Sequence, residues 1–100
     1  MEISKVKNGS EMELVIEGRL DTSSAPDLAR EVEVIDSEVT NLVFELEKVR
    51  YISSSGLRIL LSAQKKMNAR QGTMVVRHPN ELIMEVFEET GFIDLLTIEQ

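Results

Sequence analysis

Three consecutive hydroxyl side chains, Ser53, Ser54 and Ser55, are the residues of this sequence best suited to chemistry. They follow an apolar, strand-like segment and precede Gly56 and Leu57, where an apolar helical periodicity begins. A serine hydroxyl at a helix N-terminus accepts a hydrogen bond from a backbone N–H group of the first turn. A phosphate on such a hydroxyl would meet N–H groups that have no partner within the helix. The pattern is therefore typical of a helix cap and of a phosphorylation site.

The presence of Gly56 in the serine corner is an argument for contact with a partner molecule there. One serine is enough to cap a helix, and glycine is a poor helix former in the first turn. A glycine is easier to explain if a partner must approach the backbone closely at this point. The residues alone leave capping and partner contact both open.

A second polar loop, Asp21-Thr22-Ser23-Ser24, precedes another predicted helix. Ser24 is suited to be the N-cap of that helix, with Pro26 in its first turn. If the strands before the two loops are neighbours in the sheet, both loops emerge at the same edge. Asp21 would then lie close to the serine hydroxyls.

Enzymatic and metal-binding alternatives find little support. The only histidine, His78, precedes Pro79 and is predicted to be an exposed turn residue rather than a general base. The segment Ser62-Ala63-Gln64-Lys65 matches S-x-x-K but lies within a predicted helix, without the other elements of that catalytic class. The sequence also lacks cysteine, a G-x-S-x-G elbow and a phosphate-binding loop. We therefore predict a non-enzyme without cofactor or metal, and a small hydrolase remains a minor alternative.

Composition limits the partners. One hundred residues suit a single domain, and the net charge of −7 argues against nucleic acid. The charge instead favours a basic protein surface as partner. No apolar run approaches the ~20 residues that span a bilayer, and the first residues do not resemble a signal peptide. We expect a cytoplasmic protein without direct membrane insertion.

Periodicity and turn residues predict an α/β protein with a mixed β-sheet and helices packed on it, in the order β-β-α-β-α-β-α-β. The predicted elements are a hairpin within residues 3–16, a helix from Ala25 to near residues 35–37, a strand over 40–46, a helix ending at Gln71-Gly72, a strand over 73–77, a helix from Asn80 to Thr90-Gly91, and a last short strand.

Four segments carry a further pattern: Gly18-Arg-Leu-Asp21, Ala25-Pro26, Tyr51-Ile-Ser-Ser-Ser-Gly-Leu57 and Gly91-Phe-Ile93. At this spacing they resemble the STAS domain and, more narrowly, bacterial anti-sigma factor antagonists. The resemblance extends over essentially the whole chain. It implies a single STAS domain over residues 1–100.

In such antagonists the corner before the central helix usually reads Asp-Ser-Ser/Thr-Gly-Leu. The first serine after the aspartate is phosphorylated by a partner kinase that is also the anti-sigma factor. Ser54 matches this phosphoacceptor, and Asp21 matches the acidic residue of the family's first-helix loop. The sequence departs from the pattern at Ser53, which replaces the usual aspartate and removes one negative charge.

The resemblance implies a phosphorylation-controlled partner-switching module. It would bind an anti-sigma factor with serine kinase activity, release a sigma factor and be reset by a serine phosphatase. The alternative is a STAS subunit of a transporter-associated or stress-signalling complex, in which the corner is a contact without phosphorylation. Besides Ser54, the predicted partner-binding residues are Asp21, Thr22, Ser23, Ser53, Ser55, Gly56, Leu57 and Arg58.

Overall fold

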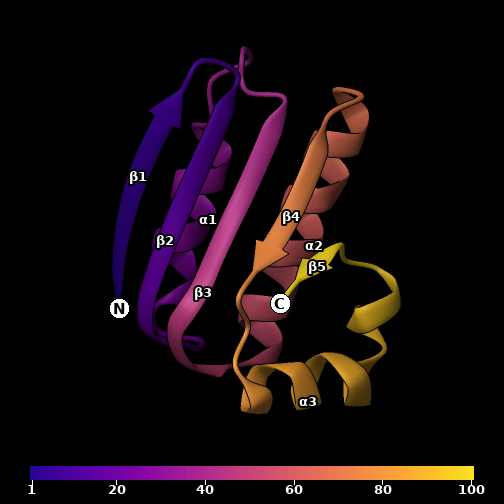
Figure 1. The fold of residues 1–100 in the computed structure, drawn as a ribbon. Helices are drawn as coiled ribbons and strands as arrows, with labels where there is room; N and C mark the ends of the chain where they lie inside the picture. Colours follow the sequence, from indigo (N-terminus) through magenta and orange to yellow (C-terminus); the bar gives the residue numbers. More distant parts are fainter.

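The computed structural model describes residues 1–100 as one five-stranded sheet with three helices and a short 3-10 turn (Figure 1). The predicted α/β class and order of elements are confirmed. The elements are β1 (Glu2–Asn8), β2 (Glu11–Leu20), α1 (Ala25–Glu33), β3 (Asn41–Ile52), α2 (Ser54–Ala69), β4 (Thr73–Arg77), α3 (Glu81–Thr90), η1 (Phe92–Asp94) and β5 (Ile98–Glu99).

The strands lie in the order β1-β2-β3-β4-β5, and only the β1–β2 pair is antiparallel. Since β2 and β3 are parallel neighbours, their carboxyl ends lie at the same edge of the sheet. Leu20 and Ile52 are paired in register, and the Ser53 N–H donates to the Leu20 carbonyl at 2.9 Å. The condition for the Asp21 and serine loops to emerge side by side is therefore met.

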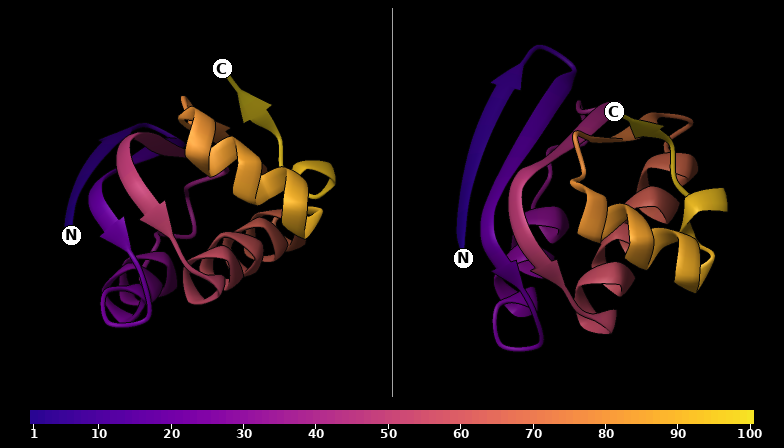
Figure 2. Two further views of the ribbon diagram at one scale, coloured as in Figure 1. Left: turned by 90° about the horizontal axis from the view of Figure 1, so that it is seen from below. Right: turned by 60° about the horizontal axis from the view of Figure 1, so that its bottom comes forward.

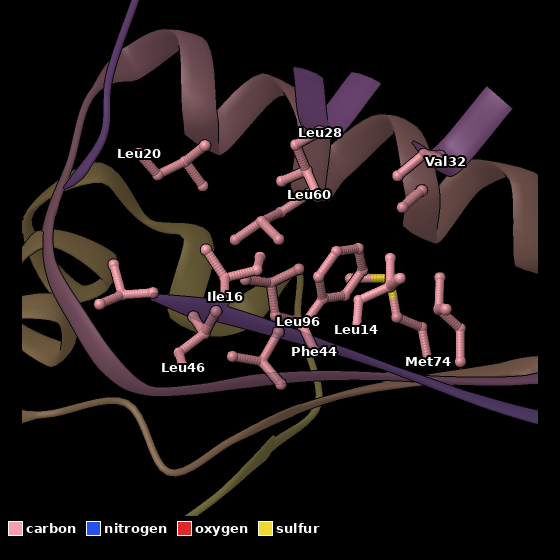
Figure 3. Close-up of a cluster of buried hydrophobic side chains, with 14 of the residues drawn as sticks. Leu14, Ile16, Leu20, Leu28, Val32, Phe44, Leu46, Leu60, Met74 and Leu96 are labelled. Atoms are coloured by element: carbon pink, nitrogen blue, oxygen red, sulfur yellow. The ribbon is translucent and has the colours of Figure 1, made fainter. Parts of the chain in front are cut away.

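Helices α1 and α2 lie side by side on one face of the sheet, and α3 crosses near the carboxyl end of β3 (Figures 1 and 2). The core forms between α1, α2 and the sheet. Leu28 and Leu60 from the helices face Leu14, Ile16 and Phe44 from the strands, and all five are fully buried (Figure 3). Each such side chain contributes about 1.5–3 kcal/mol of hydrophobic stabilisation. This core fixes the helices against the strands that precede them.

Two basic side chains, Lys66 of α2 and Arg70 at its C-cap, tie this helix to the end of α1 and to the loop that follows α1. The Lys66 ammonium donates to the carbonyls of Val32 and Glu33, at 2.8 and 3.0 Å. The Arg70 guanidinium donates to the carbonyls of Asp36 and Val39, at 2.7 and 3.0 Å. The Lys66 bonds reach the last turn of α1 and the Arg70 bonds reach the loop after it, so they hold α2 against this part of the chain.

Three boundaries differ from the predictions. Strand β2 continues to Leu20, past the expected end of the hairpin at residue 16, because its last residues pair with β3. Strand β3 was expected over residues 40–46 but extends over Asn41–Ile52. The exposed residues Glu47 and Lys48 interrupt the apolar run, yet the strand continues because it pairs with β2 through register shifts. Helix α1 ends at Glu33, two to four residues before the expected end near residues 35–37, with Val34 as its C-cap.

Candidate functional site

The three serines of the corner differ in their surroundings, and Ser53 is the cap. It precedes α2 in extended conformation, and its hydroxyl accepts a hydrogen bond from the Gly56 N–H at 3.4 Å. Its side chain is half-buried. The capping role that the sequence left open among the serines therefore belongs to Ser53.

Ser54 is the exposed serine of the three. It is the first residue of α2, and its hydroxyl makes no hydrogen bond within the chain. Ser55 is half-buried, and its hydroxyl lies 3.4 Å from that of Thr22. The corner thus presents one free hydroxyl to solvent, at a helix N-terminus whose first N–H groups have no partner within the helix.

The packing of the chain itself explains Gly56. A Cβ atom at this position would lie 2.7 Å from Leu20 Cγ and 2.9 Å from Ile52 Cγ1. Both neighbours are core side chains, so the glycine lets α2 begin directly against the ends of β2 and β3. The expected close approach of a partner is therefore not needed to explain it. Gly56 and Leu57 are buried, which removes both from the predicted contact surface.

The Asp21 loop is stabilised by hydrogen bonds among its own residues. One oxygen of the Asp21 carboxylate accepts from the Ser23 hydroxyl at 2.8 Å and from the backbone N–H groups of Ser23 and Ser24, at 3.1 and 3.2 Å. These bonds, with that of the Ser23 hydroxyl the strongest, lower the pKa of Asp21 below its ordinary value. Ser24 occupies the N-cap position of α1 but makes no capping bond with its side chain, contrary to our prediction. Its hydroxyl donates to the Arg19 carbonyl at 2.8 Å instead.

The two loops meet through the hydroxyls of Thr22 and Ser55. Asp21 was expected near the serine hydroxyls, but its carboxylate bonds within its own loop and lies 3.6 Å from the Arg19 guanidinium. A shallow groove of about 290 Å³ begins at the Thr22–Ser55 contact and is lined by Pro26 on α1 and Arg58 on α2. Thr22, Ser55 and Arg58 therefore share one surface between the amino ends of the two helices.

Two arginines outside the predicted partner-binding residues lie beside the Asp21 loop. Arg19 and Arg50 line a second hollow together with Asp21, and the Arg19 guanidinium lies 4.3 Å from the ring centroid of Tyr51. With Arg58, the corner carries three arginines although the chain has a net charge of −7. These arginines add local positive charge, whereas the expectation of a basic partner surface rested on the net charge of the whole chain. Arg19 and Arg50 each lie shortly before a polar loop, and this position was the available signal.

A family model for the STAS domain matches residues 2–100. The chain belongs to the STAS domain family. Among its relatives, the Listeria monocytogenes anti-sigma-B factor antagonist is 27% identical over 96 residues, which cover 95% of this chain and 84% of the relative. The Bordetella bronchiseptica protein BtrV is 30% identical over 84 residues, 83% of this chain and 72% of BtrV.

Solved structures share this STAS fold at lower identity. The Bacillus cell fate determinant SpoIIAA, solved in its phosphorylated form, matches with a TM-score of 0.77 at 16% identity over 99% of this chain and 92% of SpoIIAA. A sulfate transporter family protein from Wolinella succinogenes matches with a TM-score of 0.78 at 20% identity, over 92% and 75% of the two chains. The same fold therefore occurs in proteins of different function.

Proposed function

We propose that this STAS domain is an anti-sigma factor antagonist whose binding is switched off by phosphorylation of Ser54. Unmodified, the corner binds an anti-sigma factor that is also a serine kinase, and the sigma factor is released. A serine phosphatase resets the switch. In this scheme the chain is a ligand and a substrate rather than an enzyme.

The observation that carries the proposal is the free, exposed hydroxyl of Ser54 at the start of α2. A kinase requires an accessible hydroxyl, and the neighbouring serines already have partners. Ser53 bonds Gly56, and Ser55 contacts Thr22. Phosphorylation of Ser54 would leave both contacts intact, so the fold should survive the modification.

The surroundings of Ser54 suit a phosphate. The N-terminus of α2 favours negative charge, and the first N–H groups of a helix are available as donors. Arg58 lies four residues further along α2 and is exposed, within reach of a charge on Ser54. Because Ser53 replaces the family's usual aspartate, no carboxylate from that position opposes the phosphate.

Loss of binding follows from the same charges. A partner that complements Arg19, Arg50 and Arg58 presents an acidic surface. A phosphate adds about −1.5 to −2 charges, which repel such a surface and draw Arg58 into an internal ion pair. A loss of ~3 kcal/mol would weaken binding by more than about a hundredfold.

The relatives support this role. The Listeria monocytogenes relative is an anti-sigma-B factor antagonist, and SpoIIAA has been solved in unphosphorylated and phosphorylated forms. No helix of this chain has both the length and the apolar character needed to cross a membrane. We expect the protein to act in the cytoplasm, with its sigma factor.

The direct test compares binding of wild type, Ser54→Ala and Ser54→Asp to the cognate anti-sigma factor by isothermal titration calorimetry. We expect Ser54→Ala to bind within a few-fold of wild type and Ser54→Asp to bind much more weakly. Ser37→Asp is the matched control, because it adds the same charge at an exposed position beyond the carboxyl end of α1. Equal binding by Ser54→Asp and wild type would contradict the electrostatic switch.

Mass spectrometry after incubation with the kinase and ATP identifies the acceptor. We expect one phosphate on Ser54 and none on the Ser54→Ala variant. Phosphate on Ser23 or Ser53 would move the acceptor to another residue of the corner.

The second candidate is a contact module of a transporter-associated complex, supported by the fold shared with the Wolinella succinogenes protein. In that case the same corner binds its partner without phosphorylation. Stable copurification with a membrane transporter rather than a kinase, with Ser54 unmodified, would favour this function.

A further inference from the structure

A second cluster of polar side chains lies apart from the serine corner. It consists of Glu45 and Glu47 on β3 and His78, which follows β4. Each residue offers one atom that could bind a metal ion, and these three atoms lie within 4.8 Å of one another. The shortest of these contacts joins His78 Nδ1 to Glu45 Oε1 at 2.7 Å.

The sheet brings these residues together. Glu45 is paired in register with Arg77, the last residue of β4, so the next residue, His78, lies beside Glu45. Side chains alternate along a strand, and Phe44 belongs to the core beneath α1 and α2. Glu45 and Glu47 therefore point to the opposite face of the sheet. Residue spacing could not indicate this cluster, because 33 residues separate Glu45 from His78.

Backbone hydrogen bonds fix the Glu45 carboxylate and the main chain of His78. The Glu47 N–H donates to Glu45 Oε2 at 3.0 Å, which leaves Glu45 Oε1 directed at the histidine ring. The His78 N–H donates to the Glu99 carbonyl at 2.8 Å. The side chain of Glu45 is only 15% exposed, so it has little freedom to turn away. Glu45 is therefore preorganised, and a cation bound there would replace the hydrogen bond between Glu45 Oε1 and His78 Nδ1.

The nearest arginine has other partners. The Arg77 guanidinium lies 3.1 Å from the Glu99 carboxylate and 3.8 Å from that of Glu13. The two carboxylates of the cluster therefore have no arginine as counterion, and His78 is their neighbour. Two carboxylates and one imidazole with ligand atoms within 4.8 Å of one another form a site suited to a cation.

We propose that Glu45, Glu47 and His78 form a binding site for Zn²⁺. One imidazole nitrogen and two carboxylate oxygens are ligands that Zn²⁺ accepts in tetrahedral geometry, with water as the fourth ligand. Mg²⁺ and Ca²⁺ prefer sites made entirely of oxygen, so they should bind more weakly. The site lies on the face of the sheet away from α1 and α2, and the inference is independent of the function proposed for Ser54.

Bound Zn²⁺ would link the middle of β3 to the connection between β4 and α3. An unfolded chain does not hold residues so far apart in sequence at ligand distance, so Zn²⁺ should bind the folded chain preferentially. We therefore expect Zn²⁺ to raise the thermal unfolding midpoint in a concentration-dependent manner. The His78→Gln variant should lose this increase.

The test uses full-length protein without a histidine tag, titrated with ZnCl₂ in a calorimeter. We expect one Zn²⁺ per chain, and Glu45→Gln or His78→Gln should weaken binding by roughly tenfold or more. The matched control is the double variant Glu88→Gln, Glu89→Gln on α3, which removes two exposed carboxylates elsewhere and should bind as wild type does.

Nuclear magnetic resonance gives a second readout, since the chain has a single histidine. The imidazole ¹H–¹⁵N spectrum reports on His78 alone, and one equivalent of ZnCl₂ should shift its signals whereas MgCl₂ should not. Unshifted signals, or equal Zn²⁺ affinity of wild type and Glu45→Gln, would overturn the proposal. Unfolding curves measured without Zn²⁺ identify any variant that fails to fold.

Discussion

The loop Asp21–Ser24 and the corner Ser53–Gly56 make the same kind of strand-to-helix connection in different ways. Each joins a parallel strand to the helix that follows it, each contains serines, and the two lie side by side at one edge of the sheet. In the first loop the Asp21 carboxylate bonds Ser23 and Ser24 and leaves the loop closed. In the second, Ser53 makes the cap and Ser54 keeps a free hydroxyl.

The difference shows what makes a serine available for chemistry. A carboxylate can accept several hydrogen bonds, so Asp21 draws in the neighbouring donors of its loop. A serine cap accepts from one backbone N–H group and leaves the next residue without a local partner. With Ser53 as the cap, the hydroxyl of Ser54 makes no hydrogen bond within the chain.

The largest expected effect on stability is at Gly56. Gly56→Ala would place a methyl group against Leu20 and Ile52, and we expect the free energy of unfolding to fall by about 1–3 kcal/mol. Urea unfolding followed by circular dichroism measures the change. In a double-mutant cycle with Leu20→Ala, the two substitutions should cost less together than their sum, since the smaller Leu20 side chain makes room. Strict additivity would show that the contact with Leu20 is not the cause.

A second effect concerns Asp21 and depends on pH. Its pKa is lowered in the folded chain, so its contribution to stability is present above the ordinary aspartate pKa and disappears as the pH falls through the lowered folded value. Asp21→Asn should therefore lose less stability than wild type between about pH 4 and pH 2. Thermal unfolding midpoints across this range measure the difference. Asp94→Asn, at an exposed carboxylate without a hydrogen-bond partner, should follow the wild-type curve.

The smallest expected effect separates the neighbouring serines. Ser53→Ala removes the cap of α2, whose hydrogen bond is long, and should cost about 0.5–1 kcal/mol of stability. Ser54→Ala should change stability by less than about 0.5 kcal/mol, because the hydroxyl has no partner. Chemical unfolding of the two variants in parallel makes the comparison. A larger loss at Ser54 than at Ser53 would reverse the roles assigned to them.

Local sequence patterns predicted the order of helices and strands, because each element shows its own spacing of apolar residues. The alternation within residues 3–16 and the spacing of Leu57, Leu60 and Leu61 depend only on which face is buried. The second half of β3 could not be predicted in this way. Residues 47–51 are mostly exposed, and they are held as a strand by pairing with β2 across register shifts. Such pairing is a tertiary effect that overrides local preference.

The site was predictable in part for the same reason. Parallel neighbours were enough to expect the Asp21 loop beside the serines. The choice of Ser53 as cap, the packing of Leu20 against Gly56 and the Thr22–Ser55 contact depend on side-chain distances that residue spacing does not determine. The burial of Gly56 and Leu57 likewise follows from tertiary packing. The short motif therefore indicated where the corner lies. It could not distinguish the residues that a partner can contact from the buried residues that only position the corner.

The hydrogen bond from the Ser53 N–H to the Leu20 carbonyl has a consequence for the timing of modification during synthesis. It joins residues on either side of α1, so the corner takes shape only when β2 and β3 have paired. Parallel pairing of this kind forms late relative to local helices and hairpins. Under the proposed function, a kinase that recognises the assembled corner would not phosphorylate nascent or misfolded chains. Phosphorylation of Ser54 would therefore be restricted to chains that have already folded.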